Sequence, residues 1–595
     1  MKTKFREIVG KAGNVVFLYP MVLVIALLTS VGAIYMAETN YNYSDTLLFT
    51  YSKITMCCGL GISLLFALKM LSQRIGKAFL LEICGVIFLI GFYFVFPDDK
   101  KEFIETYGYI IAITFLLSHL LVSFVPFLDK NRELNFWQYN KNLFVNIFLT
   151  VIFTGVLTGG VELAVLAVDK LFDFDFNNKL YADLFFVLAI FGSCFIFLLF
   201  NEIGLNYLEK DGKYPVILKF FTQFILIPLL FIYVIILYFY SFKILINWQL
   251  PRGWVSYLVL AYSIVGILAL LLVHPLKENN TKSWVKIFSK VFYFTIIPLI
   301  ILLFTAIFTR ILEYGYTEPR YFVLLLALWL LSIVIYFVFK KNSSIKFIPI
   351  SLFAFGVFAL IFPYLNAFSV AKRSQKSELL KLLNEKQLLS NNKVDFQKKV
   401  TDTIVNEIGD KFEFLAERKQ EDFLLDLVDS KKNHTLENEI KVNPFLSLRY
   451  SVQSEFTNTN RTISSDYERL SLESEKQYIT IDNYQYFFNL RNYNDDTKEI
   501  NGDKFNIIER SDKGVTLKVD LNSKEEVDFT PGINNLFKEY SGRKGVIKLP
   551  EISLEKDLGK YHIKVVFLNI SNDKSPYNKA GAIYYDNAVL LIKEK

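Results

Sequence analysis

The chain has 595 residues, of which 53% are hydrophobic, 16% aromatic and 21% charged, and its formal net charge is +7. Residues 1–370 hold 29 Lys and Arg against 21 Asp and Glu, whereas residues 371–595 hold 36 against 37. The surplus cations lie between apolar segments, where a membrane protein keeps them, so this composition excludes a general nucleic-acid binder.

The residue types that usually carry metal or redox chemistry are few and scattered. The cysteines all lie in apolar segments and are Cys57, Cys58, Cys84 and Cys194. The four histidines lack metal-ligand spacing, and the common zinc, phosphate-loop and nucleophile motifs do not occur. We therefore predict no disulfide framework, no metal or cofactor site and no catalytic residues.

Eleven apolar segments approach or reach the roughly 20 residues that a helix needs to cross a bilayer. Helices keep their backbone hydrogen bonds internal, as hydrocarbon requires. The predicted spans are 15–36, 54–71, 79–96, 107–127, 144–166, 182–200, 221–240, 254–275, 285–308, 321–339 and 347–368. The sequence thus predicts a membrane all-α helical bundle of about eleven transmembrane helices over residues 1–370. The first apolar run is longer than a signal peptide needs, so we expect a retained anchor.

The loops between these spans predict the orientation of the chain. With the N-terminus inside, the inner loops and adjoining span ends hold 20 Lys and Arg, and the outer side holds 9. Cytoplasmic loops carry this excess of cations, which indicates a cytoplasmic N-terminus in the cell inner membrane. An odd number of spans then places the C-terminal domain in the periplasm. The cluster Lys372, Arg373 and Lys376 after the last span argues for the opposite side.

The polar residues 371–595 predict a small α+β soluble domain. Residues 371–442 predict a helical linker or subdomain, with one helix around Leu379–Leu389 and another from Phe412 to Val428. Residues 443–595 predict a β-rich domain with a β-sandwich-like C-terminal part. The predicted strands are Tyr478–Ile481, Tyr484–Leu490, Val515–Val519, Tyr561–Ile570 and Ala582–Ile592, with turns at Asn501-Gly502, Lys513-Gly514 and Pro531-Gly532.

The fifth predicted span carries polar residues at four-residue steps beside Gly155, Gly159 and Gly160. A four-residue step advances about 400°, so these residues form a slowly winding stripe. Together with a histidine of the fourth span, they form the candidate intramembrane polar site: His119, Asn146, Thr150, Thr154, Thr158 and Glu162. One interpretation is helix packing, because small residues and back-bonded threonines serve contacts between helices. The other is the wall of a polar cavity or substrate path, because a carboxylate in hydrocarbon usually marks a functional interior.

Several stretches of residues 1–370 resemble the domain-of-unknown-function 4153 family of bacterial multi-span membrane proteins. The resemblance is carried by Phe17-Leu18-Tyr19-Pro20, by Phe136-Trp137-x-Tyr139-Asn140, by Gly159-Gly160-Val161-Glu162, by Asp169-Lys170-Leu171-Phe172 and by Leu250-Pro251-Arg252-Gly253-Trp254. It implies an inner-membrane protein with no established activity, and it supplies no catalytic residues to transfer.

Three hypotheses of function follow, and the lipid bilayer is a partner in each. The first is a carrier, or a protein that handles lipids or envelope precursors, based on the polar stripe. The second is a non-enzymatic sensor or scaffold whose outer β-rich domain binds an envelope ligand or partner. The third is a membrane enzyme that acts on a lipid-linked substrate through Glu162, Asp169 and Asp173. No motif supports the third hypothesis, so we expect no enzyme.

Overall fold

The computed structural model divides the chain into two compact units. The first comprises Met1–Asp395 and Ile408–Val452, and the second comprises Phe396–Glu407 and Gln453–Lys595. The structure describes residues 2–39, 46–129, 132–172, 174, 176–210, 214–247, 254–274, 283–340, 343–429, 433–442, 448–457, 468–476, 478–490, 496–510, 516–540, 545–575 and 578–595.

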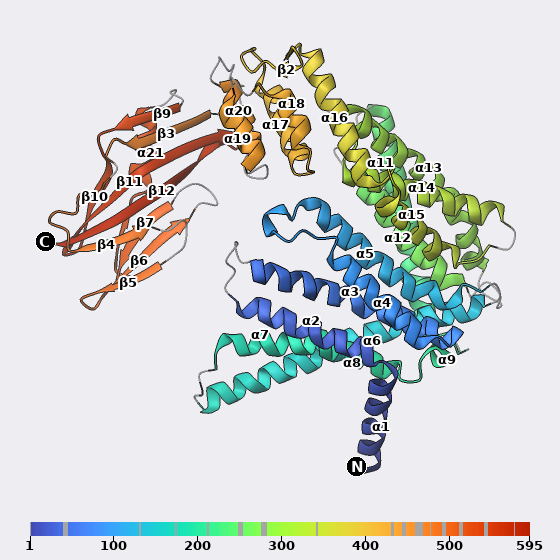
Figure 1. Ribbon diagram of the computed structural model, residues 1–595. Coiled ribbons are helices and arrows are strands. Elements are labelled where there is room, and N and C mark those ends of the chain that lie inside the picture. The colour runs from blue at the N-terminus through green and yellow to red at the C-terminus, as the bar shows by residue number, and fades with distance from the viewer. Residues whose placement is uncertain are drawn as a thin grey trace. The chain divides into compact units, whose positions relative to one another are not determined.

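The first unit is built from helices, most of them apolar (Figure 1). The helices up to residue 208 are α1 (Lys2–Leu18), α2 (Pro20–Glu38), α3 (Thr46–Ile75), α4 (Ala78–Tyr93), η1 (Lys100–Glu102), α5 (Glu105–Phe124), η2 (Val125–Phe127), α6 (Glu133–Phe172), α7 (Asn178–Phe186), η3 (Val187–Gly192), α8 (Ser193–Phe200) and α9 (Leu205–Leu208). The helices that follow are α10 (Val216–Phe220), η4 (Phe221–Leu226), α11 (Ile227–Asn247), α12 (Trp254–Val273), α13 (Ser283–Tyr314), α14 (Glu318–Phe339), α15 (Phe347–Ile361) and α16 (Ala367–Glu385). The segments η3 and η4 are π-helical.

Nine helices in the described part of the chain are long and apolar enough to cross a membrane. The protein is therefore a polytopic membrane protein. Two of the eleven predicted spans, 79–96 and 347–368, correspond to the shorter apolar helices α4 and α15, of 16 and 15 residues. They lie among the long ones, because α4 packs along α3, and α15 packs along α5 and α14. The number of spans predicted from the sequence is thus approximate.

The first predicted span, 15–36, is interrupted near its start. Proline has no N–H to donate, and its ring disfavours continuation of a helix through it. Accordingly, Tyr19 leaves the helical conformation and Pro20 begins α2. In Figure 1, α1 runs across the direction of α2 and does not extend its axis.

The helical part after the last span is more broken than predicted. It contains the short strands β1 (Leu389–Ser390) and β2 (Lys393–Val394), then α17 (Asp402–Ala416), α18 (Glu421–Leu427), α19 (His434–Val442) and α20 (Leu448–Thr457). The predicted helix from Phe412 to Val428 is wrong in its continuity. A turn containing Lys419 at φ 57° separates α17 from α18, and a helix cannot pass through that conformation.

The second unit contains two antiparallel-rich sheets that share one hydrophobic core. The first sheet has the order β4 (Tyr486–Leu490), β12 (Asn578–Glu594), β11 (Tyr561–Ser575), β3 (Glu468–Ser474) and β9 (Gly545–Leu549), with β10 (Ile552–Leu558) also paired to β11. The second has the order β5 (Asp496–Ile500), β6 (Asp503–Arg510), β7 (Thr516–Leu521) and β8 (Glu525–Asp528). Phe505 and Val519 of one sheet and Val565 and Leu590 of the other belong to the same core. The predicted β-sandwich-like architecture is thus confirmed.

Three details of the β-rich prediction differ from the structure or fall outside it. Tyr478–Ile481 is not a strand but part of a segment without regular structure, and residues of it cover the outer face of the sheet beside Val566 and Leu591. Pro531-Gly532 lies inside the helix α21 (Thr530–Glu539), where proline occupies the first turn and loses no helical hydrogen bond. The turn Lys513-Gly514 lies outside the described residues.

Substitution of Gly266 tests the packing of two spans. A Cβ at Gly266 of α12 would collide with the Phe292 ring of α13. We expect Gly266→Ala to destabilise the protein by about 1–3 kcal/mol, because overpacking forces the ring from its position. The control is Gly91→Ala in α4, where an added Cβ meets nothing within 4 Å. Thermal unfolding in detergent should show a lower Tm for the first variant only, and equal Tm values would contradict the packing.

Candidate functional site

Two polar clusters of the first unit are candidates for function. The first, which we name the intramembrane row, consists of Asn146, Thr150, Thr154, Thr158 and Glu162 of α6. The second, which we name the Arg418 cluster, joins a turn after α17 to the ends of membrane helices. It consists of Glu105, Tyr109, Glu318, Glu417 and Arg418.

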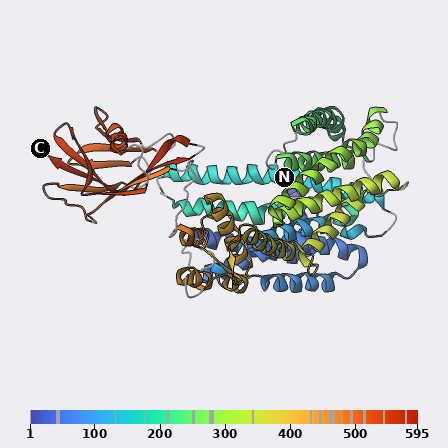
Figure 2. The same ribbon diagram turned by 90° about the horizontal axis from the view of Figure 1, so that it is seen from above.

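Two hydrogen bonds establish the level of the intramembrane row relative to α2. The Tyr19 hydroxyl donates to the Asn201 carbonyl at 2.8 Å at the start of α2, and Lys179 Nζ donates to the Glu38 carbonyl at 3.2 Å at its end. The 19 residues of α2 span about 28 Å, close to the thickness of the hydrocarbon core. The segment α7–η3–α8 therefore crosses the same layer, and α6 runs beside it in both views (Figures 1 and 2).

The Asn146 end of the row is satisfied by hydrogen bonds within the chain. Asn146 Nδ2 donates to Asn201 Oδ1 at 2.9 Å, and Asn201 Nδ2 donates to the Phe197 carbonyl at 2.6 Å. The Thr150 hydroxyl donates to the Asn146 carbonyl of its own helix at 2.7 Å. These contacts tie α6 to α8 at the level of Tyr19, and they are what helix packing in hydrocarbon requires.

The middle of the row is not satisfied in this way. Thr154 and Thr158 are each 8% exposed, and their hydroxyl oxygens are buried without a hydrogen-bond partner among the described residues. The neighbouring Gly155 and Gly159 do not serve close packing within the chain, because a Cβ added at either would meet nothing within 4 Å. Packing inside this chain therefore explains the Asn146 end of the row better than its middle.

Glu162 lies toward the end of the layer that is opposite to Asn146. It is 16 residues beyond Asn146, which corresponds to about 24 Å along the helix. Its side chain is half-buried, and it has no hydrogen bond or ion pair with any described residue. A carboxylate at this depth is costly unless it reaches water or a partner.

His119 does not join the row. It lies on an exposed face of α5, and its Nδ1 is 2.8 Å from the Phe115 carbonyl of the same helix. Asp169 of the third hypothesis is buried and accepts a hydrogen bond at 2.6 Å from the Phe176 backbone N–H. It thus closes the turn between α6 and α7. Asp173 lies outside the described residues.

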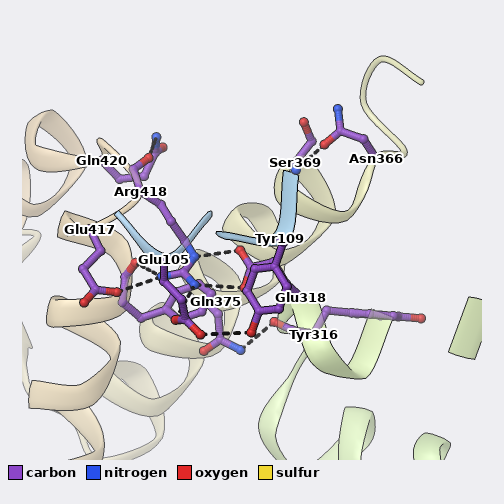
Figure 3. Close-up of polar contacts among 11 residues, drawn as sticks. Glu105, Tyr109, Tyr316, Glu318, Asn366, Ser369, Gln375, Glu417, Arg418 and Gln420 are labelled. Atoms are coloured by element: carbon purple, nitrogen blue, oxygen red, sulfur yellow. Dashed lines mark hydrogen bonds and ion pairs between the residues drawn. The ribbon is translucent and has the colours of Figure 1, made fainter. Parts of the chain in front are cut away.

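The Arg418 cluster is built around a buried ion pair (Figure 3). Arg418 Nε and Nη2 donate to the two carboxylate oxygens of Glu318 at 2.7 and 3.0 Å, a bidentate geometry. Glu318 is fully buried and Arg418 is 6% exposed. The Arg418 Nη1 also donates to Glu417 at 3.1 Å, and Nη2 lies 3.7 Å from Glu105. One guanidinium therefore faces three carboxylates.

These residues come from elements that are distant in sequence. Glu105 and Tyr109 stand at the start of α5, Glu318 at the start of α14, and Arg418 in the turn after α17. The Tyr109 hydroxyl donates to Glu105 at 2.9 Å. Beside them, the Gln375 amide of α16 donates to the Tyr314 and Tyr316 carbonyls at 2.9 and 2.8 Å. The cluster thus fastens the helices after the last span to the ends of two spans.

Sequence reasoning missed this cluster, because each residue alone looks ordinary. Glu318 precedes Pro319 at the start of a span, where a carboxylate usually complements the helix dipole. Glu417 and Arg418 lie in a charged turn that resembles a solvated loop. Burial raises the pKa of the Glu417 carboxyl above its ordinary value, while Arg418 acts in the opposite direction. Among the described residues, no group of three or more His, Cys, Asp and Glu could hold a metal ion.

Comparison with known proteins assigns the membrane part of the chain. Residues 23–394 match the family described as Domain of unknown function (DUF4153), and this match covers more than half of the chain. The chain belongs to this family. An uncharacterised protein of Pasteurella multocida (strain Pm70) is 24% identical over 296 residues, which are 48% of this chain and 48% of that protein. The chain therefore spans about half the length of this curated relative. No solved structure matches.

The residues that carry the family resemblance at the start of α6 bind other helices. The Trp137 indole N–H donates to the Leu271 carbonyl of α12 at 2.8 Å. The Tyr139 hydroxyl and the Asn140 amide donate to the Val122 and Ser123 carbonyls of α5 at 2.9 and 3.1 Å. These motif residues therefore position α6 and its row within the helical bundle.

Replacement of Arg418 tests the buried ion pair. We expect Arg418→Gln to lower the free energy of unfolding by about 3–5 kcal/mol, because it leaves Glu318 buried without its partner. The matched control is Lys419→Gln, because Lys419 pairs with Glu102 on the surface, with side chains 52% and 50% exposed, and such pairs contribute below about 1 kcal/mol. Chemical denaturation in detergent measures both variants.

The double variant Arg418→Met with Glu318→Leu tests whether the loss of stability comes from an unpaired buried charge, because it replaces both charged side chains by apolar ones of similar size. We expect it to regain most of the stability that Arg418→Gln loses, because Glu318, the fully buried carboxylate, is no longer present without its partner. Equal stability of Arg418→Gln and Lys419→Gln would show that the Arg418–Glu318 pair does not hold the helices together.

Proposed function

We propose that the protein handles a lipid-like amphiphile at the outer half of the α6–α8 hairpin, which fits the hypothesis of a carrier or lipid-handling protein. The observation that carries this proposal is Glu162, a carboxylate at the outer edge of the hydrocarbon layer without a partner among the described residues. Its chemistry suits a ligand whose polar head offers hydroxyl or amine donors, because charge-assisted hydrogen bonds to a carboxylate are strong.

The exposure of the hairpin supports access from the bilayer. In the apolar windows of α6 and of Asn178–Phe200, only 11% of the residues are buried, against 28% to 61% in the other long helices. Val151, Val156 and Leu163 of α6 are each more than 60% exposed. An apolar tail lying along these side chains would bring its head to the level of Glu162, as an amphiphile in the outer leaflet requires.

A lipid-retention experiment tests this proposal. The full-length protein is purified in mild detergent, and its bound lipids are quantified by mass spectrometry. We expect Glu162→Gln to lose about tenfold or more of one retained species, because a hydrogen bond to a charged group contributes about 1.5–3 kcal/mol. Glu313→Gln is the control, because Glu313 is an exposed carboxylate at the end of another span. Identical lipid profiles in all three proteins would count against the proposal.

We also propose that the protein lies in the inner membrane with a cytoplasmic N-terminus and a periplasmic C-terminal domain. The proposal is supported by the uneven distribution of Lys and Arg among the loops. It is also supported by the packing of α4 and α15 along long spans. If each of these short helices crosses the membrane once, the number of crossings is odd and the two ends of the membrane part lie on opposite sides.

The topology can be tested with a reporter fused after Lys595. We expect alkaline phosphatase in this position to be active, since it folds only on the periplasmic side, and a fluorescent protein that folds only in the cytoplasm to stay dark. The reversed pattern would place the β-rich domain in the cytoplasm and would mean that one crossing is miscounted.

The Arg418 cluster favours a second candidate function, a non-enzymatic sensor or scaffold. A buried ion pair that binds the post-membrane helices to α5 and α14 would transmit displacement of those helices to the spans. In that case the β-rich domain binds an envelope ligand or partner, and the hairpin serves as an anchor. The lipid experiment separates the two candidates, because under the second the lipid profile does not depend on Glu162.

A further inference from the structure

The helix α1 has the sequence pattern of an amphipathic helix. Its apolar residues recur at steps of three and four, which places them within about one third of the helix circumference. They are Phe5, Ile8, Val9, Ala12, Val15 and Val16. The remaining positions are mostly polar or glycine, except for Phe17 and Leu18 beside the junction with α2.

Among the described side chains of this apolar face, burial and exposure differ along the helix. Val15 is fully buried in the core that also contains Tyr19 and Val22. Val9 and Val16 are each 54% exposed, and Phe17 is 88% exposed. The helix is thus held at its end near Tyr19, while Val9 and Val16 of its apolar face are exposed.

The position of α1 determines which surroundings meet this face. The bond from Tyr19 to Asn201 marks the inner end of the membrane layer, and α1 turns aside at this level (Figure 1). A helix that leaves a span at the edge of the hydrocarbon and runs across the span direction lies along the membrane surface. Exposed apolar side chains at that depth meet the boundary between headgroups and acyl chains.

The charge of α1 indicates the kind of lipid. Residues 2–18 contain Lys2, Lys4, Arg6 and Lys11 against the single acidic residue Glu7, a net charge of +3. Lys11 pairs with Glu202 at 3.2 Å, which anchors the helix beside α8. Basic residues at the membrane surface are attracted to anionic headgroups, at about fivefold in affinity for each residue.

We infer that α1 is an interfacial helix that binds the anionic lipid surface at the inner ends of the spans. Its apolar face enters the boundary of the acyl chains, and Lys2, Lys4 and Arg6 bind the anionic headgroups. This inference does not rest on the proposed function of Glu162, because it concerns the opposite side of the membrane and other residues.

The test uses the full chain with a fluorophore on Val9→Cys. Cys84 is the exposed native cysteine and is changed to Ser, whereas Cys57, Cys58 and Cys194 are buried and stay unlabelled under native conditions. The labelled protein is placed in vesicles of phosphatidylcholine alone or mixed with phosphatidylglycerol. Quenching by spin-labelled lipid reports contact with acyl chains, and quenching by iodide reports contact with water.

We expect stronger lipid quenching and weaker iodide quenching in the anionic vesicles, with the difference reduced at high salt. Changing Lys2, Lys4 and Arg6 to Gln should weaken the docked state by on the order of 100-fold and abolish the difference between vesicles. The control exchanges Lys and Arg at the same positions, keeps the charge, and should behave like the parent.

Three outcomes would overturn the inference. Iodide quenching without lipid quenching in both vesicles would place α1 in water. Lipid quenching that is equal in the two kinds of vesicle and unchanged in the Gln variant would show that anionic headgroups do not bind α1. Protection from both quenchers would show that protein covers the face. An unchanged Tm of the Gln variant confirms that these results come from folded protein.

Discussion

Hydrocarbon offers no hydrogen-bond partners, so each polar group inside a membrane protein must find one within the chain or draw one from outside. This constraint explains the Asn146 end of the intramembrane row, where the side chains of Asn146, Asn201 and Thr150 form hydrogen bonds with one another or with their own helices. The part of the row from Thr154 to Glu162 differs from this end. Thr154 and Thr158 are buried without a partner among the described residues. Glu162 likewise lacks one there. The proposal of a lipid-like ligand follows from this contrast within a single helix.

The same constraint explains why Arg418 and Glu318 form a buried ion pair. The Glu318 carboxylate is removed from water at the start of a span, and the bidentate contact with Arg418 compensates for its lost hydration. Because Arg418 belongs to the helices after the last span, this compensation also fixes where those helices sit. The segment at 371–442 therefore acts in part as an extension of the membrane bundle. The composition of this segment predicts a helical linker or subdomain and does not reveal this contact.

The hydrogen bonds at the start of α6 show which residues hold this helix within the membrane part. Trp137, Tyr139 and Asn140 each donate a hydrogen bond to a backbone carbonyl of another helix. Their role is to hold the long helix α6 against its neighbours. Among the nine long apolar helices of the described residues, α6 and the segment Asn178–Phe200 are nevertheless the least buried within the chain. The motif residues thus hold α6 in place, and Thr154, Thr158 and Glu162 are the members of the row without a partner among the described residues.

The sequence alone determined the membrane character, the approximate spans, the family and the β-rich C-terminal part. These features follow from local quantities, namely the length of apolar runs and the two-residue period of strands, which need no knowledge of the partners of each segment. The tertiary structure decided what depends on contacts between distant residues. It separated satisfied from unsatisfied members of the row, placed His119 away from it, broke the first span at Pro20 and brought Arg418 to Glu318 across 100 residues of sequence. Such pairings leave no trace in local composition, because a charged residue before a proline or in a polar turn looks the same whether it ends up in water or buried against its partner.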